Sequence, residues 1–125
     1  METEVILTAE APIPGGAYSQ AIRAGEVIFL AGQVGRDPAT GDTREGVAAQ
    51  TQQALHNLEA VLVAAGGSLS QLVKTTCFLT SISDFAEFNA AYEDVMGGHK
   101  PARSTVGVEL ATGLLVEIEG VAVLG

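Results

Sequence analysis

Residues 100–123 read KPARSTVGVELATGLLVEIEGVAV, and this stretch says more about the fold than any other part of the chain. It predicts two apolar strands, 104–110 and 115–123, separated by the turn ATG. Arg103 stands at the mouth of the first strand, and two glutamates, of which Glu117 is the earlier, stand inside the second. Charged side chains among Val, Ile and Leu are costly to desolvate unless they are paired. Because an arginine fork clamps carboxylates and a half-buried glutamate can move protons, the stretch predicts a small site that holds an acid and performs water chemistry.

The residues before this stretch predict four more strands. Their β-branched, aromatic and other apolar residues indicate strands at 3–8, 19–24, 26–34 and 72–80. The segment RDPATGD at 36–42 is a turn, because its proline fixes φ and its glycine tolerates positive φ.

Two helices are predicted by apolar residues at three- and four-residue spacing. The stripes consist of Val47, Thr51, Ala54, Leu58, Val61 and Ala65 in the first helix, and of Phe85, Phe88, Tyr92 and Val95 in the second. Glycine pairs follow both stripes and end the helices. Two residue pairs have the spacing of an N-terminal capping box: Asp42 with Glu45, and Asp84 with Glu87.

The predicted order is β-β-β-α-β-α-β-β, which indicates one α+β domain spanning residues 1–125 with both helices on one face of a sheet of about six strands. Strand 26–34 is apolar on both faces: Val27, Phe29 and Ala31 lie on one, and Ile28, Leu30 and Val34 on the other. Because helices cover only one face, we expect the second face to pack against another copy of the chain.

The composition and charge of the chain indicate which kinds of partner, location and metal site are to be expected. The net charge is −9, from fifteen acidic and six basic residues, and no Lys/Arg cluster offsets it, which disfavours nucleic-acid binding. The apolar runs are too short to span a membrane, and the N-terminus has no signal-peptide pattern, so a cytoplasmic location is expected. The single cysteine, Cys77, reads as a buried apolar residue, and His56 and His99 lack a zinc-ligand spacing, so no metal is expected.

Several blocks together resemble the RidA (YjgF) family of reactive-imine deaminases. Besides PARSTV and VEIEGVAV in the stretch above, they are GAYSQA at 16–21, AGQVGRDPATGD at 31–42, VKTTCFLTSISDF at 73–85 and FNAAYEDV at 88–95. The blocks occur in the family's order and cover nearly the whole chain. The resemblance implies the chorismate-mutase-like RidA fold, with a mixed sheet, and a homotrimer whose sites lie in clefts between subunits.

The resemblance also implies roles for individual residues. Arg103 matches the arginine that binds the substrate carboxylate, and Glu117, the first glutamate of E-I-E, matches the residue that positions or activates water. Tyr18 matches a tyrosine that lines the pocket, and Asn89 matches a position near the site. Each of these residues also has a non-functional interpretation. The alternatives are a solvated arginine for Arg103, a rim residue for Glu117, an aromatic lid over the core for Tyr18 and a helix-surface amide for Asn89.

The chain departs from the best-known members at three positions. Ala17 replaces the usual proline before the tyrosine, which loosens that loop. Thr105 stands where those members carry cysteine, which excludes thiol nucleophilic chemistry at this position, and Ala31 stands where many carry serine. Carboxylate binding is expected to survive these changes, whereas the substrate preference is expected to differ.

The function implied is hydrolysis of 2-aminoacrylate and 2-imino acids to 2-keto acids and ammonia, without a cofactor. Arg103 would hold the carboxylate, Glu117 would activate water, and Tyr18 and Thr105 would add polar contacts. The main alternative is a non-catalytic trimer that binds 2-keto acids as a sensor or partner of another enzyme. RNA cleavage, known for some relatives, is a third possibility that the acidic composition opposes.

Overall fold

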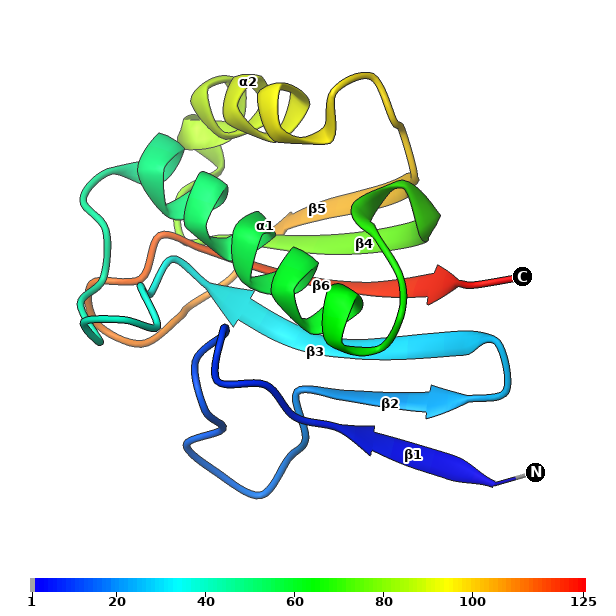
Figure 1. Ribbon diagram of the computed structural model, residues 1–125. Helices are drawn as coiled ribbons and strands as arrows, with labels where there is room; N and C mark the ends of the chain where they lie inside the picture. The colour runs from blue at the N-terminus through cyan, green and yellow to red at the C-terminus, as the bar shows by residue number, and fades with distance from the viewer. Residues whose placement is uncertain (1) are drawn as a thin grey trace.

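The computed structural model describes residues 2–125 and consists of one six-stranded sheet with two α-helices lying across one of its faces (Figure 1). The predicted fold class and element order are confirmed. The elements are β1 (Thr3–Ile6), β2 (Ala21–Ala24), β3 (Val27–Val34), α1 (Val47–Ala64), β4 (Leu72–Leu79), α2 (Phe85–Met96), β5 (Ala102–Gly107) and β6 (Val116–Val123), with short 3₁₀ helices η1 (Leu69–Gln71) and η2 (Ile82–Asp84). No helix within the described residues has the length and apolar character needed to cross a membrane.

The strands are arranged in the order β1-β2-β3-β6-β4-β5. All neighbouring strands are antiparallel except β4 and β5, which are parallel. A parallel pair needs a crossover connection, and α2 supplies it. The last strand, β6, lies between β3 and β4, so the residues of the E-I-E sequence are placed in the middle of the sheet. The segment carrying Arg103 forms the edge strand β5.

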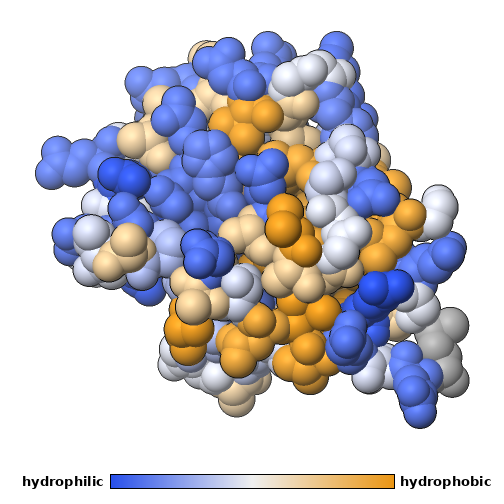
Figure 2. Space-filling model, in the orientation of Figure 1, coloured by the Kyte–Doolittle hydropathy of each residue, from blue (hydrophilic) through white to orange (hydrophobic). Residues whose placement is uncertain are grey.

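Alternation along the central strands buries one face of the sheet under the helices. Ile28 and Leu30 of β3 and Ile118 of β6 are at most 4% exposed, and they pack against fully buried leucines of α1 such as Leu55 and Leu58. On the surface of this side, Figure 2 shows polar side chains over α2 and the loop before α1, and apolar ones lower down, around β1 and β2. The core therefore lies between α1 and α2 and the helix-covered face of the sheet.

A bulge in β3 changes part of the predicted alternation. The register with β6 shifts between Leu30 and Gln33, so that Gln33 lies opposite Ile118 on the helix-covered face and is only 6% exposed. Val34 instead pairs with Glu117 on the other face. The expectation that Val34 shares a face with Ile28 and Leu30 is therefore wrong, because a bulge inserts a residue and reverses the facing of those after it.

Neither predicted capping box forms. α1 begins after Gly46, whose φ of 84° and lack of a side chain provide no cap, and Asp84 before α2 makes no side-chain cap hydrogen bond. A capping box is found instead at η1, between Ser68 and Gln71. The C-terminal prediction for α2 is confirmed, since Gly97 adopts a left-handed conformation with φ 62°. Strand ends also differ: the strand expected at 104–110 spans 102–107.

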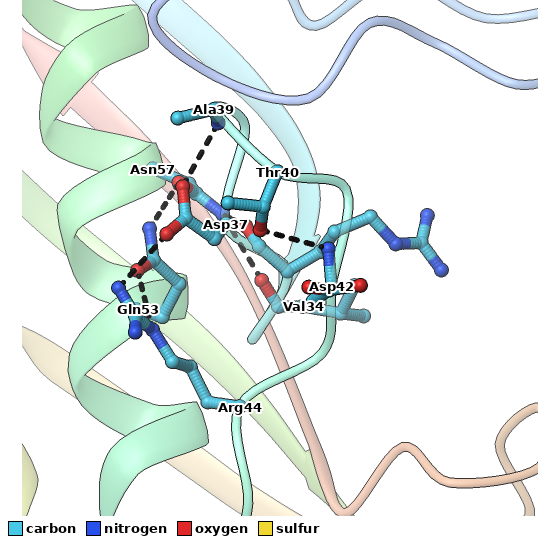
Figure 3. A network of polar contacts seen from close by, with 9 residues as sticks. Val34, Asp37, Ala39, Thr40, Asp42, Arg44, Gln53 and Asn57 are labelled. Carbon is cyan, nitrogen blue, oxygen red and sulfur yellow. Dashed lines mark hydrogen bonds and ion pairs between the residues drawn. The ribbon is translucent and has the colours of Figure 1, made fainter.

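The loop between β3 and α1 is attached to the helix by side-chain hydrogen bonds (Figure 3). Asn57 of α1 donates to the carbonyl oxygens of Val34 and Arg36 at 3.1 and 2.9 Å. Arg44 donates to a carboxylate oxygen of Asp37 at 3.0 Å, the one ion pair found within residues 2–125. The two hydrogen bonds of Asn57 fix the end of β3 against α1 and with it the strand that lies beside Glu117.

The close approach of β3 and α1 at Gly35 leads to a stability prediction. A Cβ at Gly35 would lie 2.5 Å from the Cα of Gln50, and backbone cannot yield as a flexible side chain does. We expect Gly35→Ala to lower the free energy of unfolding by about 1–3 kcal/mol through overpacking. Urea unfolding measures this, with Gly15→Ala as the control because a Cβ there meets nothing within 4 Å. Equal midpoints for the two variants would contradict the helix–strand packing described.

Candidate functional site

The side chain of Arg103 is half-buried on the helix-covered face of the sheet. Its strand neighbour is Thr75 of β4, which is fully buried under α2. The guanidinium carbon lies 4.8 Å from the ring centroid of Tyr92, 5.5 Å from that of Phe85 and 5.6 Å from that of Phe88. Within residues 2–125 no hydrogen bond or ion pair to this guanidinium is found, so its charge and N–H donors are available to a ligand.

A cavity of about 810 Å³ opens beside Arg103, between the C-terminal half of α2 and the start of β5. Its lining has both polar and apolar surface and comprises Asn89, Tyr92, Glu93, Asp94, Gly97, Gly98, His99, Lys100, Pro101 and Arg103. His99 is held by a 2.7 Å hydrogen bond between its Nε2 and the carbonyl oxygen of Leu72. The cavity gives a small carboxylic acid direct access to the arginine.

Two further predicted site residues lie on the Arg103 side. Asn89 lines the same cavity, and its amide donates to a carboxylate oxygen of Glu93 at 3.3 Å. Thr105 follows Arg103 by two residues on β5 and therefore shares its face, where it pairs with Cys77. Thr105 is not among the residues that line the cavity.

Glu117 lies on the opposite, uncovered face of the sheet. It stands on β6 between Val34 of β3 and Phe78 of β4, with Glu119 on the same face two residues along. Burial raises the pKa of the Glu117 carboxyl above its ordinary value of 4.5, and the charge of Glu119 raises it further. The predicted facing of both glutamates is confirmed. A group of this kind can accept a proton more readily than an exposed glutamate.

The bulge of β3 makes room for the Glu117 carboxylate. A Cβ added at Gly32 would collide with that group, lying 2.8 Å from its Cδ. Ala31, the neighbouring residue in the bulge, donates its backbone N–H to the carbonyl oxygen of Gln20 at 3.0 Å. Gly32 is therefore a further candidate site residue, which the sequence signals only through its place in the AGQVG block.

Tyr18 lies in the loop between β1 and β2 and is 56% exposed. Its hydroxyl oxygen accepts a weak hydrogen bond from the backbone N–H of Gly15 at 3.4 Å. The loop is fastened by the buried amide of Gln20, which donates to the carbonyl oxygens of Thr8 and Pro12 at 3.0 and 2.8 Å. The tyrosine ring is thus an exposed side chain on a fixed loop.

Within one chain, the predicted site residues do not come together in one place. Arg103, Thr105 and Asn89 lie on the helix side of the edge strand β5. Glu117 and the β3 bulge lie on the other face, and Tyr18 precedes β2, which three strands separate from β5. The sheet itself stands between the arginine and the glutamate. A site that uses both requires a second copy of the chain.

The remaining candidates are the possible metal ligands and the single cysteine. Within residues 2–125 no group of three His, Cys, Asp or Glu side chains lies close enough to hold a metal ion. Cys77 is fully buried, as predicted, and burial raises the pKa of its thiol to about 11. Its hydrogen bond to Thr75 and the charges of Arg103 and Lys74 only partly offset that effect.

Cys77 should therefore be unreactive in the folded protein. At about pH 8 the thiol stays protonated and inaccessible, so we expect a thiol-specific disulfide reagent to modify it only as fast as the protein unfolds. Labelling followed by mass spectrometry in buffer and in urea measures the difference. Rapid labelling in buffer would show that β4 is open to solvent at this point.

The fold and the candidate residues define a class: small α+β chains with an arginine on an edge strand and a half-buried glutamate on a central strand, the arginine having no ion-pair partner within residues 2–125. The family model described as endoribonuclease L-PSP matches residues 8–124. A RutC family protein of Pyrococcus horikoshii is 47% identical over 121 residues, covering 95% of this chain and 96% of its own. The chain belongs to the endoribonuclease L-PSP family, which is the RidA/YjgF family.

Two further relatives add a printed function and a solved structure. The 2-iminobutanoate/2-iminopropanoate deaminase of Rattus norvegicus is 43% identical over 124 residues, covering 98% of this chain and 90% of its own. The crystal structure of RidA from the Antarctic bacterium Psychrobacter superposes with a TM-score of 0.92 at 41% identity, covering 96% and 98% of the two chains. The RidA fold expected from the sequence is thereby confirmed.

Proposed function

We propose that the protein hydrolyses 2-aminoacrylate and 2-imino acids to 2-keto acids and ammonia, without a metal or organic cofactor. Relatives named 2-iminobutanoate/2-iminopropanoate deaminase, from rat, mouse and Salmonella, are 40–43% identical to this chain over nearly its whole length. Others at similar identity are named only as RutC family proteins, so the names alone do not decide the activity. The site chemistry carries the rest of the argument.

The observation that carries the proposal is the unpaired guanidinium of Arg103. The chain has fifteen acidic residues and a net charge of −9, yet none of them within residues 2–125 forms an ion pair with this half-buried arginine. A cation left without an anion beside a cavity is a binding site for one. The planar guanidinium fits a carboxylate through two parallel hydrogen bonds, and every 2-imino acid has a carboxylate.

Glu117 would supply the proton transfers. Its carboxylate takes a proton from water as the oxygen attacks the carbon of the protonated imine, which gives a neutral carbinolamine. The same carboxyl group then returns that proton to the nitrogen and takes the hydroxyl proton as the C–N bond breaks, so that ammonia and the 2-keto acid leave. The raised pKa of Glu117 suits a group that must both accept and return a proton. Tyr18 and Thr105 would add hydrogen bonds to the substrate.

We propose further that the working unit is a homotrimer, with each site made by Arg103 of one copy and Glu117 of the next. Their positions on opposite faces of one sheet support this assignment. So does the exposed apolar face around Glu117, where Val5, Phe29, Val106 and Val123 are 37–64% exposed across the sheet. Apolar area of this kind calls for a partner surface. Light scattering that gives a monomer at micromolar concentration would contradict this assembly.

Trapping of the imine tests the activity. An amino-acid oxidase generates 2-imino acids, and semicarbazide traps those that survive. We expect the protein to suppress trapping in proportion to its concentration, and a series of amino acids to reveal the substrate preference. Unchanged trapping at every concentration would contradict the proposal.

A non-catalytic role in binding 2-keto acids is the second candidate. It is favoured by one observation: Arg103 and its cavity are complete on one side of the sheet without Glu117. Pyruvate binding measured by calorimetry, together with unchanged imine trapping, would select this role. RNA cleavage fits the description of the family model, but the net charge of −9 opposes phosphate-backbone binding.

A further inference from the structure

The three aromatic rings of α2 that surround Arg103 form what we call the aromatic cradle: Phe85, Phe88 and Tyr92. All three ring centroids lie within 5.6 Å of the guanidinium carbon. Attraction between a cation and the face of a ring operates in this range. The sequence shows these residues only as the apolar stripe of a helix, a pattern that packing against the sheet would also produce.

The aromatic cradle contacts the Arg103 guanidinium without accepting hydrogen bonds from its N–H groups. Arginines that are fixed by a carboxylate lose both charge and N–H groups to it, as Arg44 does with Asp37 at 3.0 Å. Ring faces accept no conventional hydrogen bond, so the charge of Arg103 and its N–H donors remain directed at a ligand.

The rings are themselves fixed. Phe88 is fully buried, and its centroid lies 5.7 Å from that of Tyr92 and 6.1 Å from that of Phe85. The hydroxyl of Tyr92 is 2.7 Å from Oγ1 of Thr75, the residue that pairs with Arg103 across the β4–β5 ladder. The ring closest to the guanidinium is therefore attached to the strand beside the arginine, which couples the position of α2 to that of β5.

We propose that the aromatic cradle is a set of positioning residues that hold the Arg103 guanidinium ready for the substrate carboxylate and thereby contribute to substrate affinity. This inference rests on the proposed function, in which Arg103 is the carboxylate clamp. The cradle touches the arginine and not the reacting carbon, so it acts on ground-state binding and not on the chemical step.

Phe85 offers the cleanest test because it is 38% exposed and its removal leaves the core intact. We expect Phe85→Leu to raise the Kd for pyruvate and the KM for the imine about three- to tenfold, with kcat unchanged. Ile82→Ala is the matched control. Ile82 is an exposed apolar residue of the preceding 3₁₀ helix, and it has no aromatic ring to interact with the guanidinium.

A spectroscopic signature separates positioning from general packing. The chain has four arginines, Arg23, Arg36, Arg44 and Arg103, so their side-chain Nε–Hε signals can be assigned by substitution. Protons above a ring face are shielded, and we expect the Hε signal of Arg103 to lie upfield in the wild type and to move downfield in Phe85→Leu. It should not move in Ile82→Ala.

The outcomes distinguish the inference from the function on which it rests. If the wild type binds pyruvate and suppresses imine trapping, while Phe85→Leu has the same Kd and KM as the wild type, the cradle is packing alone and the proposed function stands. If the wild type neither binds pyruvate nor suppresses trapping, the proposed function fails and the role of the cradle in carboxylate binding fails with it.

Discussion

Arg103→Ala is expected to lose most imine hydrolysis. The change removes charge-assisted hydrogen bonding to the substrate carboxylate. One such bond is worth about 1.5–3 kcal/mol, which corresponds to a loss of about 10- to 150-fold in kcat/KM. Pyruvate affinity should fall by a similar factor, because the 2-keto acid carries the same carboxylate. Steady-state trapping assays and calorimetry measure the two effects separately.

Arg44→Ala is the matched control for this variant. It removes the same side chain from an exposed position, where the guanidinium already binds Asp37 and Gln53 (Figure 3). Exposed ion pairs contribute little, so both stability and activity should stay near the wild-type values. If Arg103→Ala hydrolysed imines as fast as Arg44→Ala, the carboxylate clamp would be wrong.

Glu117→Gln is expected to have the larger effect on the chemical step. The amide keeps the shape of the side chain but cannot take a proton from water, and general-base catalysis contributes about 10²–10⁴-fold. We therefore expect kcat to fall by about that factor while pyruvate still binds, because Arg103 is unchanged. A variant with wild-type kcat would exclude Glu117 as the base.

The pH dependence of kcat/KM in the wild type should reflect the pKa of Glu117. A base must be deprotonated, so kcat/KM falls as pH drops through the pKa of Glu117, and burial places this limb above the ordinary glutamate value. The charge of Glu119 is the second cause of the raised pKa. Glu119→Gln should therefore move the limb to lower pH, whereas an unmoved limb would assign it to another group.

Glu117→Gln should lower the activity without lowering the free energy of unfolding. Because the pKa is raised in the folded state, the proton on Glu117 stabilises the fold at low pH, and this contribution is lost as pH rises through the folded pKa. At neutral pH the wild type bears the cost of a half-buried charge, which the amide avoids. We expect the variant to be at least as stable as the wild type, so its lost activity cannot be attributed to unfolding.

The order of strands and helices was predictable because it depends on local pattern. Period-two alternation gave β6 with Glu117 facing away from Ile118, and three-four spacing gave both helices. The helix starts were not predictable in the same way. An acidic residue with capping-box spacing caps a helix only if the backbone places its side chain within hydrogen-bond distance of the first free N–H groups. At α1, Gly46 stands at the N-cap position instead.

The face on which each site residue lies could not be read from the sequence. Alternation relates residues within one strand, but Arg103 and Glu117 lie on different strands, and only the ladder through β4 relates their faces. The bulge between Leu30 and Gln33 is equally invisible in a run of apolar residues. The resemblance to RidA proteins named the candidate residues, whereas their distribution over the two faces of the sheet required the structure.

The most direct test is complementation between the two inactive variants. In a cyclic trimer built from equal amounts of Arg103→Ala and Glu117→Gln chains, one site in about four combines an intact arginine with an intact glutamate from the neighbouring copy. Coexpression of the two variants should therefore restore about a quarter of the wild-type suppression of imine trapping, which is more than either variant is expected to show alone. A mixed protein that stays as inactive as its two components would show that the arginine and the glutamate of different copies do not work together.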